Sequence, residues 1–376
     1  MEPTQLHYRG GFGWFLLTHF HQFIHGHSWS SPSFWKSVLG KDRFSANEIP
    51  DLTGKVAIVT GANKGIGYHT ALELASHGCS KVFLACRSRE RAMAAIKSIK
   101  QELWLRGLAP LPNYDDDGRE IQDTDEDQQQ LQFLELDLAD IRQCQDAAKT
   151  FLAKGLPLHI LINNAGIGTE RTGLIDGIEC HMAVNHFGPF AFTLPLVDRL
   201  IESQPSRVVI VSSIAHECSV KGGINFERMN DPTLTDNHYV KYAQSKTANI
   251  LFAKALARRL VGHKVYVNAV HPGVVDTAIF DHIGAVTSPT FGRIFLKLNR
   301  LCAMTAERGA LTQLYCATSP EIEGENFRGQ WFIPIGYRHS PKKQLDRHEL
   351  QDRLWEYSEQ LVASRLANDG KNFLTQ

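Results

Sequence analysis

The chain has 376 residues, 43% of them hydrophobic, which is enough to bury the core of one large α/β domain or of two smaller ones. Its 40 basic and 40 acidic side chains cancel, so we expect no nucleic-acid partner of the kind that a strong basic field attracts. No run of 18 apolar residues occurs, and we expect no full-length membrane-spanning helix. Seven dispersed cysteines without a C-x-x-C pair predict buried, reduced thiols in an intracellular protein, with no disulfide and no metal centre.

Residues 1–50 form a leader rich in aromatic residues and histidine. Four apolar side chains within residues 11–27 share one face of a predicted helix: Phe12, Leu16, Phe20 and Phe23. Such a helix lies either in a bilayer interface or on the protein's own surface, and we predict a peripheral membrane contact. His21 and His25 are one turn apart, but a metal site is disfavoured because no cysteine or carboxylate is near them.

Strand and helix patterns alternate through a predicted catalytic domain, residues 51–340. The predicted strands are 55–60, 81–85, 132–136, 159–163, 207–212, 264–271 and 330–333. The predicted helices are 66–76, 88–105, 141–153, 182–201 and 242–260. This alternation predicts an α/β fold of the Rossmann type: a doubly wound, seven-stranded parallel sheet with helices on both faces.

Two further segments differ from this pattern. Residues 112–130 hold eight carboxylates and one arginine, which predicts a solvated, flexible insertion; a docking site for a partner is the alternative. In the predicted C-terminal region, residues 341–376, four apolar residues recur at helical spacing: Leu350, Leu354, Tyr357 and Leu361. They predict an amphipathic helix that packs back on the domain.

A glycine-rich turn follows the first strand and opens a helix, which is the context of a dinucleotide-binding turn. Gly61 allows the sharp turn, Gly65 admits a pyrophosphate close to the backbone, and Gly67 lets the helix lie close to the strand. Helix N-terminal amides then face the negative charge. The residues that we expect to bind the cofactor here are Gly61, Asn63, Lys64, Gly65, Ile66 and Gly67.

The second strand ends in "LACRSRER", where a cofactor without a 2′-phosphate would normally meet a carboxylate. Arg87 stands there instead, and Lys64 offers a second positive charge. We therefore expect NADP(H) in preference to NAD(H). After the third strand, Asp137 is placed to accept a hydrogen bond from an adenine amino group.

Two loops complete the predicted cofactor crevice. The segment "NNAG" ends the fourth strand, and its small residues bring the backbone near the cofactor through Asn164, Ala165 and Gly166. The segment "HPGVVDT" leaves a later strand, and its main-chain amides and threonine are placed to orient the nicotinamide carboxamide. The residues that we expect to contribute there are Pro272, Gly273, Val275 and Thr277.

A tyrosine and a lysine four residues apart share one helical face in "YVKYAQSK". An ammonium at Lys246, together with a positive nicotinamide ring, favours the phenolate of Tyr242, which can then exchange a proton with an alcohol or carbonyl oxygen. Of the two serines in "VVIVSSIAH", we choose Ser213 over Ser212 to hold the substrate oxygen. The amide of Asn185 is placed to hold a water linked to Lys246, and we predict these four as the catalytic residues: Asn185, Ser213, Tyr242 and Lys246.

This set, in this order, resembles the short-chain dehydrogenase/reductase family over about residues 51–336. Within the family, "ACRSRER", "LINNAG", "VSSIAH" and "HPGVVDT" look like the retinol dehydrogenase group. The segments "YAQSK" and "PGVVDTAIFDH" are similar to X-linked dehydrogenase/reductase relatives that act on polyprenol-type lipids. The resemblance implies direct hydride transfer without a metal, a lipophilic alcohol or carbonyl substrate, and a homodimer formed by helices beside the active site.

Residues 291–301 carry an apolar stripe flanked by basic residues. Such a helix lines an apolar pocket, touches an anionic membrane, or packs on the core. With the leader, it favours a lipophilic substrate collected at a membrane. We predict an enzyme that is either peripheral to the endoplasmic reticulum or a lipid droplet, or cytoplasmic. A low-turnover, NADPH-binding scaffold is the alternative function.

Overall fold

A computed structural model describes residues 41–110, 128–168, 173–231, 238–273 and 304–367. It contains an eight-stranded sheet in the order β10-β9-β8-β7-β4-β1-β2-β3. Seven of these strands run parallel, in agreement with the prediction: β1 (Val56–Thr60), β2 (Lys81–Cys86), β3 (Leu131–Glu135), β4 (Ile160–Asn163), β7 (Ser206–Val211), β8 (Val265–Val270) and β9 (Trp331–Ile333). The eighth, β10 (Tyr337–His339), pairs antiparallel with β9 and was not predicted.

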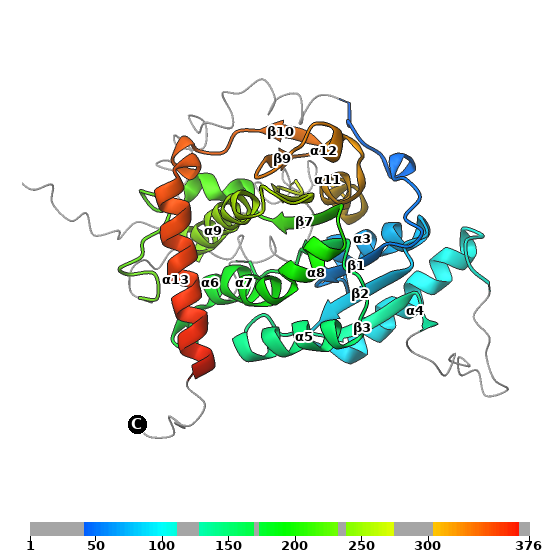
Figure 1. The fold of residues 1–376 in the computed structure, drawn as a ribbon, viewed down its shortest axis with the longest axis horizontal. Helices are drawn as coiled ribbons and strands as arrows, with labels where there is room; N and C mark the ends of the chain where they lie inside the picture. Colours follow the sequence, from blue (N-terminus) through cyan, green and yellow to red (C-terminus); the bar gives the residue numbers. More distant parts are fainter. Residues whose placement is uncertain (1–40, 111–127, 169–172, 232–237, 274–303, 368–376) are drawn as a thin grey trace, which may run out of the picture.

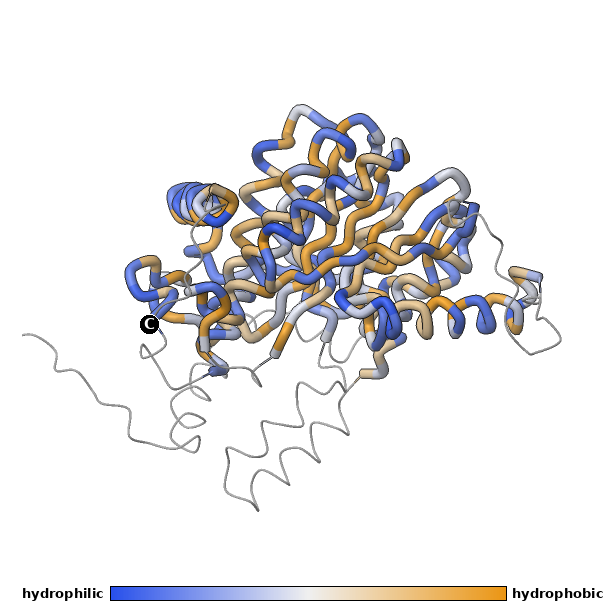
Figure 2. Tube along the Cα trace, turned by 90° about the horizontal axis from the view of Figure 1, so that it is seen from below, coloured by the Kyte–Doolittle hydropathy of each residue, from blue (hydrophilic) through white to orange (hydrophobic). Residues whose placement is uncertain are grey.

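The central strands are buried on both faces and divide their side chains between two cores. Along β1, Val56 and Ile58 belong to one core, whereas Ala57 and Val59 belong to the other, because successive side chains point to opposite faces. Figure 2 shows the hydrophobic runs concentrated in the central strands. Such continuous apolar strands are typical of a parallel sheet covered by helices on both sides.

Helices cover both faces, as predicted (Figure 1). One core contains residues of α3 (Gly65–Ser76), α4 (Arg89–Leu105) and α11 (Ala306–Thr318). The other contains residues of α5 (Ile141–Ala153), α7 (Gly188–Thr193), α9 (His238–Arg259) and α13 (His348–Ala367). Helix α11 packs against α3 and was not predicted.

The predicted C-terminal helix is present as α13, and it packs against α9 and α5. Its buried stripe is centred on Leu354, Trp355 and Val362, whereas the predicted Leu350, Tyr357 and Leu361 lie at its edge. The Arg259 guanidinium lies 4.0 Å from the centroid of the Trp355 ring, which adds a cation–π contact between α9 and α13.

The helix predicted for residues 182–201 is divided into short segments. It comprises α6 (Cys180–Met182), a π-helical turn (Ala183–Phe187), α7, a 3-10 turn (Leu194–Leu196) and α8 (Val197–Glu202). Proline at the start of α7 and in the 3-10 turn removes backbone donors from the ladder. The π-helical turn contains Asn185, and such turns often occur at functional sites.

Several small elements complete the described chain: a hairpin of β5 (Leu174–Ile175) and β6 (Ile178–Glu179), α12 (Glu321–Gly324), and 3-10 turns at Ala46–Glu48, Ile214–Cys218 and Lys343–Asp346. The six cysteines of the described residues are buried thiols, as predicted. Among these residues, no helix combines the length and the apolar character needed to cross a bilayer.

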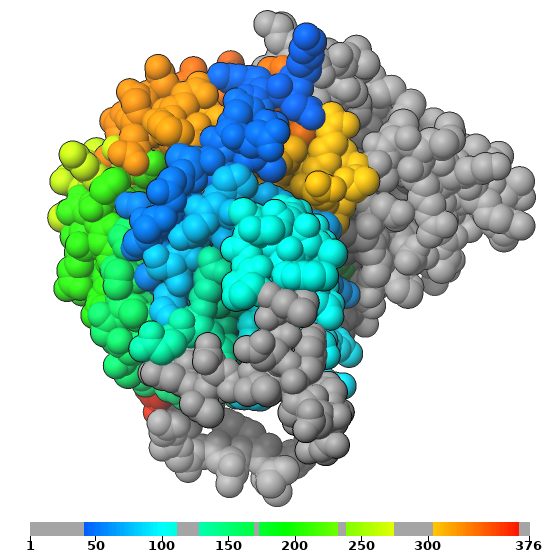
Figure 3. All heavy atoms as spheres, turned by 90° about the vertical axis from the view of Figure 1, so that its right-hand side faces the viewer, coloured from blue at the N-terminus to red at the C-terminus, as the bar shows by residue number. Residues whose placement is uncertain are grey.

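Residues 41–50, here called the N-terminal strap, run across the surface between the region of β9 and β10 and the region of α3 (Figure 3). The sequence interpretation placed them with the leader, yet Phe44 and Ile49 lie in the core beside α3 and α11. Phe44 stacks edge-to-face on Tyr315 with ring centroids 5.6 Å apart. Arg43 forms an ion pair with Glu321 at 2.9 Å.

Candidate active site

The glycine turn lies between β1 and α3, at the carboxyl edge of the sheet. A side-chain Cβ at Gly67 would lie 2.5 Å from the Gly61 carbonyl oxygen and 2.6 Å from Asn164 Nδ2, so this position requires glycine. Gly65 differs, because its φ is +58° and no atom lies within 4 Å of the position that a Cβ would take. The turn is thus tightly packed at Gly67 and open at Gly65, where a ligand can approach the backbone.

The loop after β4 is tied to the end of β1. The Thr60 hydroxyl oxygen accepts hydrogen bonds from the backbone N–H groups of Asn164, at 3.0 Å, and Ala165, at 2.9 Å. Asn164 Nδ2 donates to the Thr60 carbonyl oxygen at 2.8 Å. The sequence interpretation missed Thr60, whose signal is a hydroxyl residue immediately before Gly61.

The strand ends next to the glycine turn carry Arg87 and Asp137. Arg87 follows β2 directly, and its side chain is 58% exposed, so the guanidinium is accessible. Its Nη1 lies 3.8 Å from Asp137 Oδ2, while Asp137 Oδ1 accepts a hydrogen bond from the Ala139 N–H at 3.0 Å. The two predicted side chains therefore meet at the strand ends beside the glycine turn.

Tyr242 and Lys246 lie on α9, and the helix places Lys246 Nζ 5.6 Å from the centroid of the Tyr242 ring. Lys246 is buried, and its Nζ donates to the Val211 carbonyl oxygen at 3.2 Å. The Ser213 hydroxyl hydrogen-bonds the Tyr242 phenol. By contrast, the Ser212 hydroxyl donates to the Lys246 carbonyl oxygen at 2.5 Å, so of the two serines it is Ser213 that meets the phenol.

Burial controls the ionisation of this pair. Desolvation raises the pKa of Tyr242 to about 12, opposed by the hydrogen bond from Ser213. Desolvation also lowers the pKa of Lys246 to about 8. The sequence interpretation expected the ammonium, together with a positive nicotinamide ring, to favour the phenolate. In the structure, the pKa of Tyr242 is raised, because the loss of solvation outweighs the hydrogen bond from Ser213.

Asn185 lies in the π-helical turn and is fully buried. Its Oδ1 accepts from the Ile167 N–H at 2.7 Å, and its Nδ2 donates to the Ile167 carbonyl oxygen at 3.0 Å and to the Ser245 hydroxyl at 2.9 Å. The amide therefore holds the loop after β4 in place. Its role as the holder of a water linked to Lys246 stays a prediction.

The sequence model of the family described as "short chain dehydrogenase" matches residues 55–109, 114–226 and 233–286. Human retinol dehydrogenase 13 is 36% identical over 334 residues, which cover 87% of this chain and 91% of that protein. Human retinol dehydrogenase 11 is 40% identical over 273 residues, covering 72% and 75% of the two chains. The chain belongs to the short-chain dehydrogenase family. It is thus an oxidoreductase of a family that uses a nicotinamide cofactor.

A solved structure has the same fold as this short-chain dehydrogenase. A short chain dehydrogenase of Shigella flexneri, complexed with NADP, superposes with a TM-score of 0.53 at 20% identity and covers 76% of this chain and 98% of its own. At that identity the likeness shows the Rossmann-type fold.

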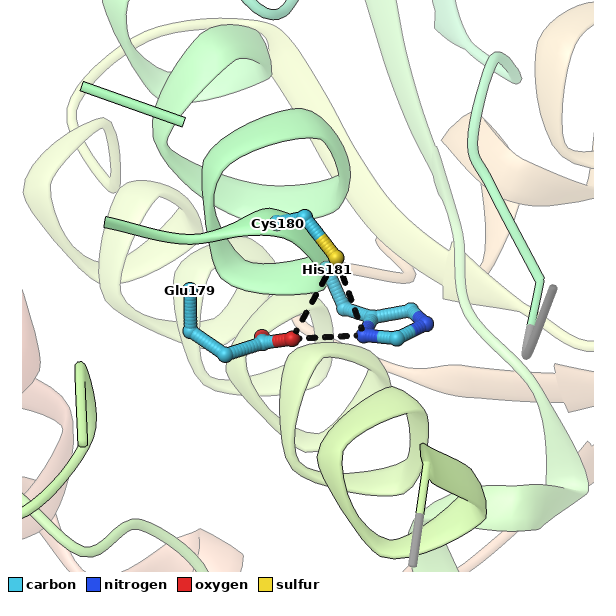
Figure 4. A group of neighbouring side chains, drawn as sticks. All are labelled: Glu179, Cys180 and His181. Carbon is cyan, nitrogen blue, oxygen red and sulfur yellow. Dashed lines mark hydrogen bonds and ion pairs between the residues drawn. The ribbon is translucent and has the colours of Figure 1, made fainter. Parts of the chain in front are cut away.

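Beside Tyr242, this dehydrogenase has a buried polar cluster that the sequence interpretation missed: Glu179, Cys180 and His181 (Figure 4). His181 Nδ1 lies 2.7 Å from Glu179 Oε1, and Cys180 Sγ lies 3.5 Å from that oxygen and 3.7 Å from Nδ1. The rings of His181 and Tyr242 meet edge-to-face with centroids 6.3 Å apart. Three consecutive residues with three different chemistries give no periodic signal, so the cluster could not be recognised from sequence.

Other predicted residues are only partly described. Pro272 is buried, and Gly273 has a φ of +97°, with Met304 Sδ 2.5 Å from the position of an added Cβ. Val275, Thr277 and both predicted membrane-contact segments, residues 11–27 and 291–301, lie outside the described residues. So does most of the acidic insertion.

Proposed function

We propose that this short-chain dehydrogenase uses NADP(H) to interconvert a lipophilic alcohol, retinoid-like or polyprenoid-like, and its carbonyl compound. The observation that carries this proposal is the meeting of Ser213 and Tyr242 beside Lys246, at the sheet edge that also carries the glycine turn. A phenol that can exchange a proton, next to a turn open to a dinucleotide, is suited to carbonyl reduction. The same groups serve both directions of the reaction, with the hydride and the proton transferred in the opposite sense.

The residues around the turn fit a phosphorylated dinucleotide. The open space at Gly65 and the N-terminus of α3 offer backbone N–H groups to a pyrophosphate. The exposed guanidinium of Arg87 and the exposed Lys64 would hold a 2′-phosphate, with Asp137 toward the adenine. Val275 and Thr277 keep their proposed place near the nicotinamide ring. When bound, the nicotinamide supplies or accepts the hydride.

Side chains of the protein transfer the proton and bind the substrate oxygen. Tyr242 donates its phenolic proton to the oxygen during reduction, and Ser213 orients that oxygen by a hydrogen bond. The raised pKa of Tyr242 keeps the phenol protonated at neutral pH, which suits a proton donor. Lys246 stabilises the phenolate that remains, and Asn185 keeps the loop after β4 in place beside it.

The names of the two retinol dehydrogenases among the relatives support a lipophilic substrate. We extend the proposal to a peripheral contact with the endoplasmic reticulum or a lipid droplet through residues 11–27 and 291–301, with a cytoplasmic enzyme as the alternative. A homodimer and a catalytic domain at residues 51–340 between leader and C-terminal region remain part of the proposal.

The test uses the purified full chain with NADPH or NADP⁺ and panels of retinoid, polyprenoid, steroid and fatty aldehydes and alcohols. Absorbance of the reduced nicotinamide reports turnover, and its fluorescence reports binding. We expect turnover of at least one lipophilic class, with a higher kcat/KM for NADP(H) than for NAD(H). Binding of NADPH without turnover on any panel would support the scaffold function instead.

A further inference from the structure

The loop after β4 is held by two side chains one helical turn apart. Asn185 bonds both backbone groups of Ile167, and His181 Nε2 lies 2.8 Å from the carbonyl oxygen of the next residue, Gly168. His181 is fully buried, and its ring also meets the edge of Tyr242. One imidazole thus touches both the loop that ends the N-N-A-G segment and the phenol proposed to move the proton.

Both ring nitrogens of His181 face oxygen acceptors. Nδ1 meets the Glu179 carboxylate at 2.7 Å, and Nε2 meets the Gly168 carbonyl. A neutral imidazole has one N–H and one lone pair, so it would turn a lone pair toward an oxygen, whereas an imidazolium donates to both. Although burial alone would lower the pKa of His181, Cys180 and Glu179 raise it to about 9.

The Glu179 carboxylate is itself held by a hydrogen bond. Glu179 Oε2 accepts a hydrogen bond from the Met182 N–H at 3.0 Å, at the start of α6. From α9 the neighbouring ionisable groups are Tyr242 and, behind it, Lys246. From the π-helical turn the nearest titratable residue, His186, is kept neutral because burial lowers its pKa to about 3.

A metal ion would use the same three residues, but the distances favour a proton. Ligand atoms around a tetrahedral zinc ion with bonds of about 2.0–2.3 Å lie more than about 3 Å apart. The 2.7 Å between Nδ1 and Oε1 is a hydrogen-bond distance. The ion pair already satisfies both atoms.

We propose that His181 is a positioning residue, which clamps Gly168 through Nε2 and thereby fixes the loop after β4 and the ring of Tyr242 for the reaction. Its catalytic consequence rests on the proposed function. The clamp itself is a property of the chain and can be measured without a ligand.

Two conservative variants separate the two bonds of the imidazole. In H181Q, the side-chain amide nitrogen takes about the position of Nε2 and keeps the hydrogen bond to Gly168. In H181N, the side-chain amide nitrogen takes about the position of Nδ1 and keeps the hydrogen bond to Glu179. We expect hydrogen exchange at Ile167 to quicken about tenfold in H181N and to stay near the wild-type rate in H181Q. We expect kcat to fall about tenfold in H181N, with most of the rate retained in H181Q.

Equal changes in exchange and kcat for both variants would overturn the clamp, since loss of packing alone affects both. A wild-type-like H181N would overturn it as well. A third outcome would also overturn the clamp: Zn²⁺ raises the melting temperature of the wild type but not that of C180S. The cluster would then be a metal site. If the wild type binds neither nucleotide, the proposed function fails, while the exchange measurement still decides the clamp.

Discussion

At the ends of β1 and β2, the candidate site is made mainly of backbone and exposed charge: the glycine turn is bare, and Arg87 is open to solvent. At the ends of β4 and β7, it is made of buried polar side chains joined by hydrogen bonds, among them Asn185, His181 and Lys246. The first region, here called the glycine half, is suited to bind a phosphorylated ligand. The second, here called the tyrosine half, holds its groups at shifted pKa values, which suits proton transfer.

The most severe test of this division is Y242F. We expect it to lower kcat about 10²–10⁴-fold, because the proton donor is lost. NADPH affinity should stay within about twofold, since the glycine half is intact. Steady-state rates and nicotinamide fluorescence measure the two effects. A parallel loss of affinity would contradict the division.

The two adjacent serines offer a matched pair within the tyrosine half. In S213A we expect kcat to fall about 100-fold, because a hydrogen bond to the reacting oxygen is lost. In S212A, which loses a bond to the Lys246 carbonyl oxygen, we expect about 1 kcal/mol of destabilisation and a rate within a few-fold of wild type. Denaturant unfolding and kcat separate them. The reverse ranking would transfer the substrate role to Ser212.

In the glycine half, R87Q should weaken NADPH binding about 10–100-fold and leave NADH binding unchanged, because a charge-assisted contact to the 2′-phosphate is lost. Stability should change little, since the Arg87 side chain, in its 3.8 Å pair with Asp137, is exposed to solvent. R91Q, at another exposed arginine nearby, is the control. Equal loss of both nucleotides would place Arg87 elsewhere in the site.

Backbone contact within the same half is tested by G67A. Its Cβ would meet the Gly61 carbonyl oxygen and Asn164 Nδ2, so we expect a destabilisation of about 1–3 kcal/mol and weaker binding of both nucleotides. G262A, where no atom lies within 4 Å of an added Cβ, should behave like the wild type. Denaturant midpoints and fluorescence titrations provide the comparison.

The pH dependence reports on the tyrosine half. Because burial lowers the pKa of Lys246 from 10.5 to about 8, kcat/KM for reduction should fall about tenfold per pH unit above about pH 8. Between about pH 8 and pH 10.5, Lys246 is protonated in the unfolded chain but neutral in the folded chain, so its contribution to the free energy of unfolding rises with pH. Unfolding therefore does not cause the fall in kcat/KM. K246R, which stays charged, should lack this decline. An unchanged profile in K246R would assign the decline to another group.

Local spacing was enough to predict much of the site. The glycine turn, Arg87 and the Tyr242–Lys246 pair each depend on residues close in sequence or on one strand end, and the structure brings them to the same edge. Thr60 and His181 were missed, because their roles depend on contacts with residues farther along or back in the chain. The strand β10 was also missed, although it pairs with β9 only a few residues earlier. The raised pKa of Tyr242 was not foreseen, since a sequence shows the neighbouring lysine but not the depth of burial.

The N-terminal strap has a consequence for biosynthesis. Its first residues are tied to the last third of the chain: Tyr337 Oη donates to the Lys41 carbonyl oxygen at 2.7 Å, and Phe44 rests on Tyr315. The ribosome synthesises the strap long before these partners. Phe44 is therefore exposed to water or bound by a chaperone while the intervening chain is translated. Premature termination before residue 315 would leave Phe44 without its packing partner Tyr315, and quality-control proteases can recognise such an incompletely packed chain.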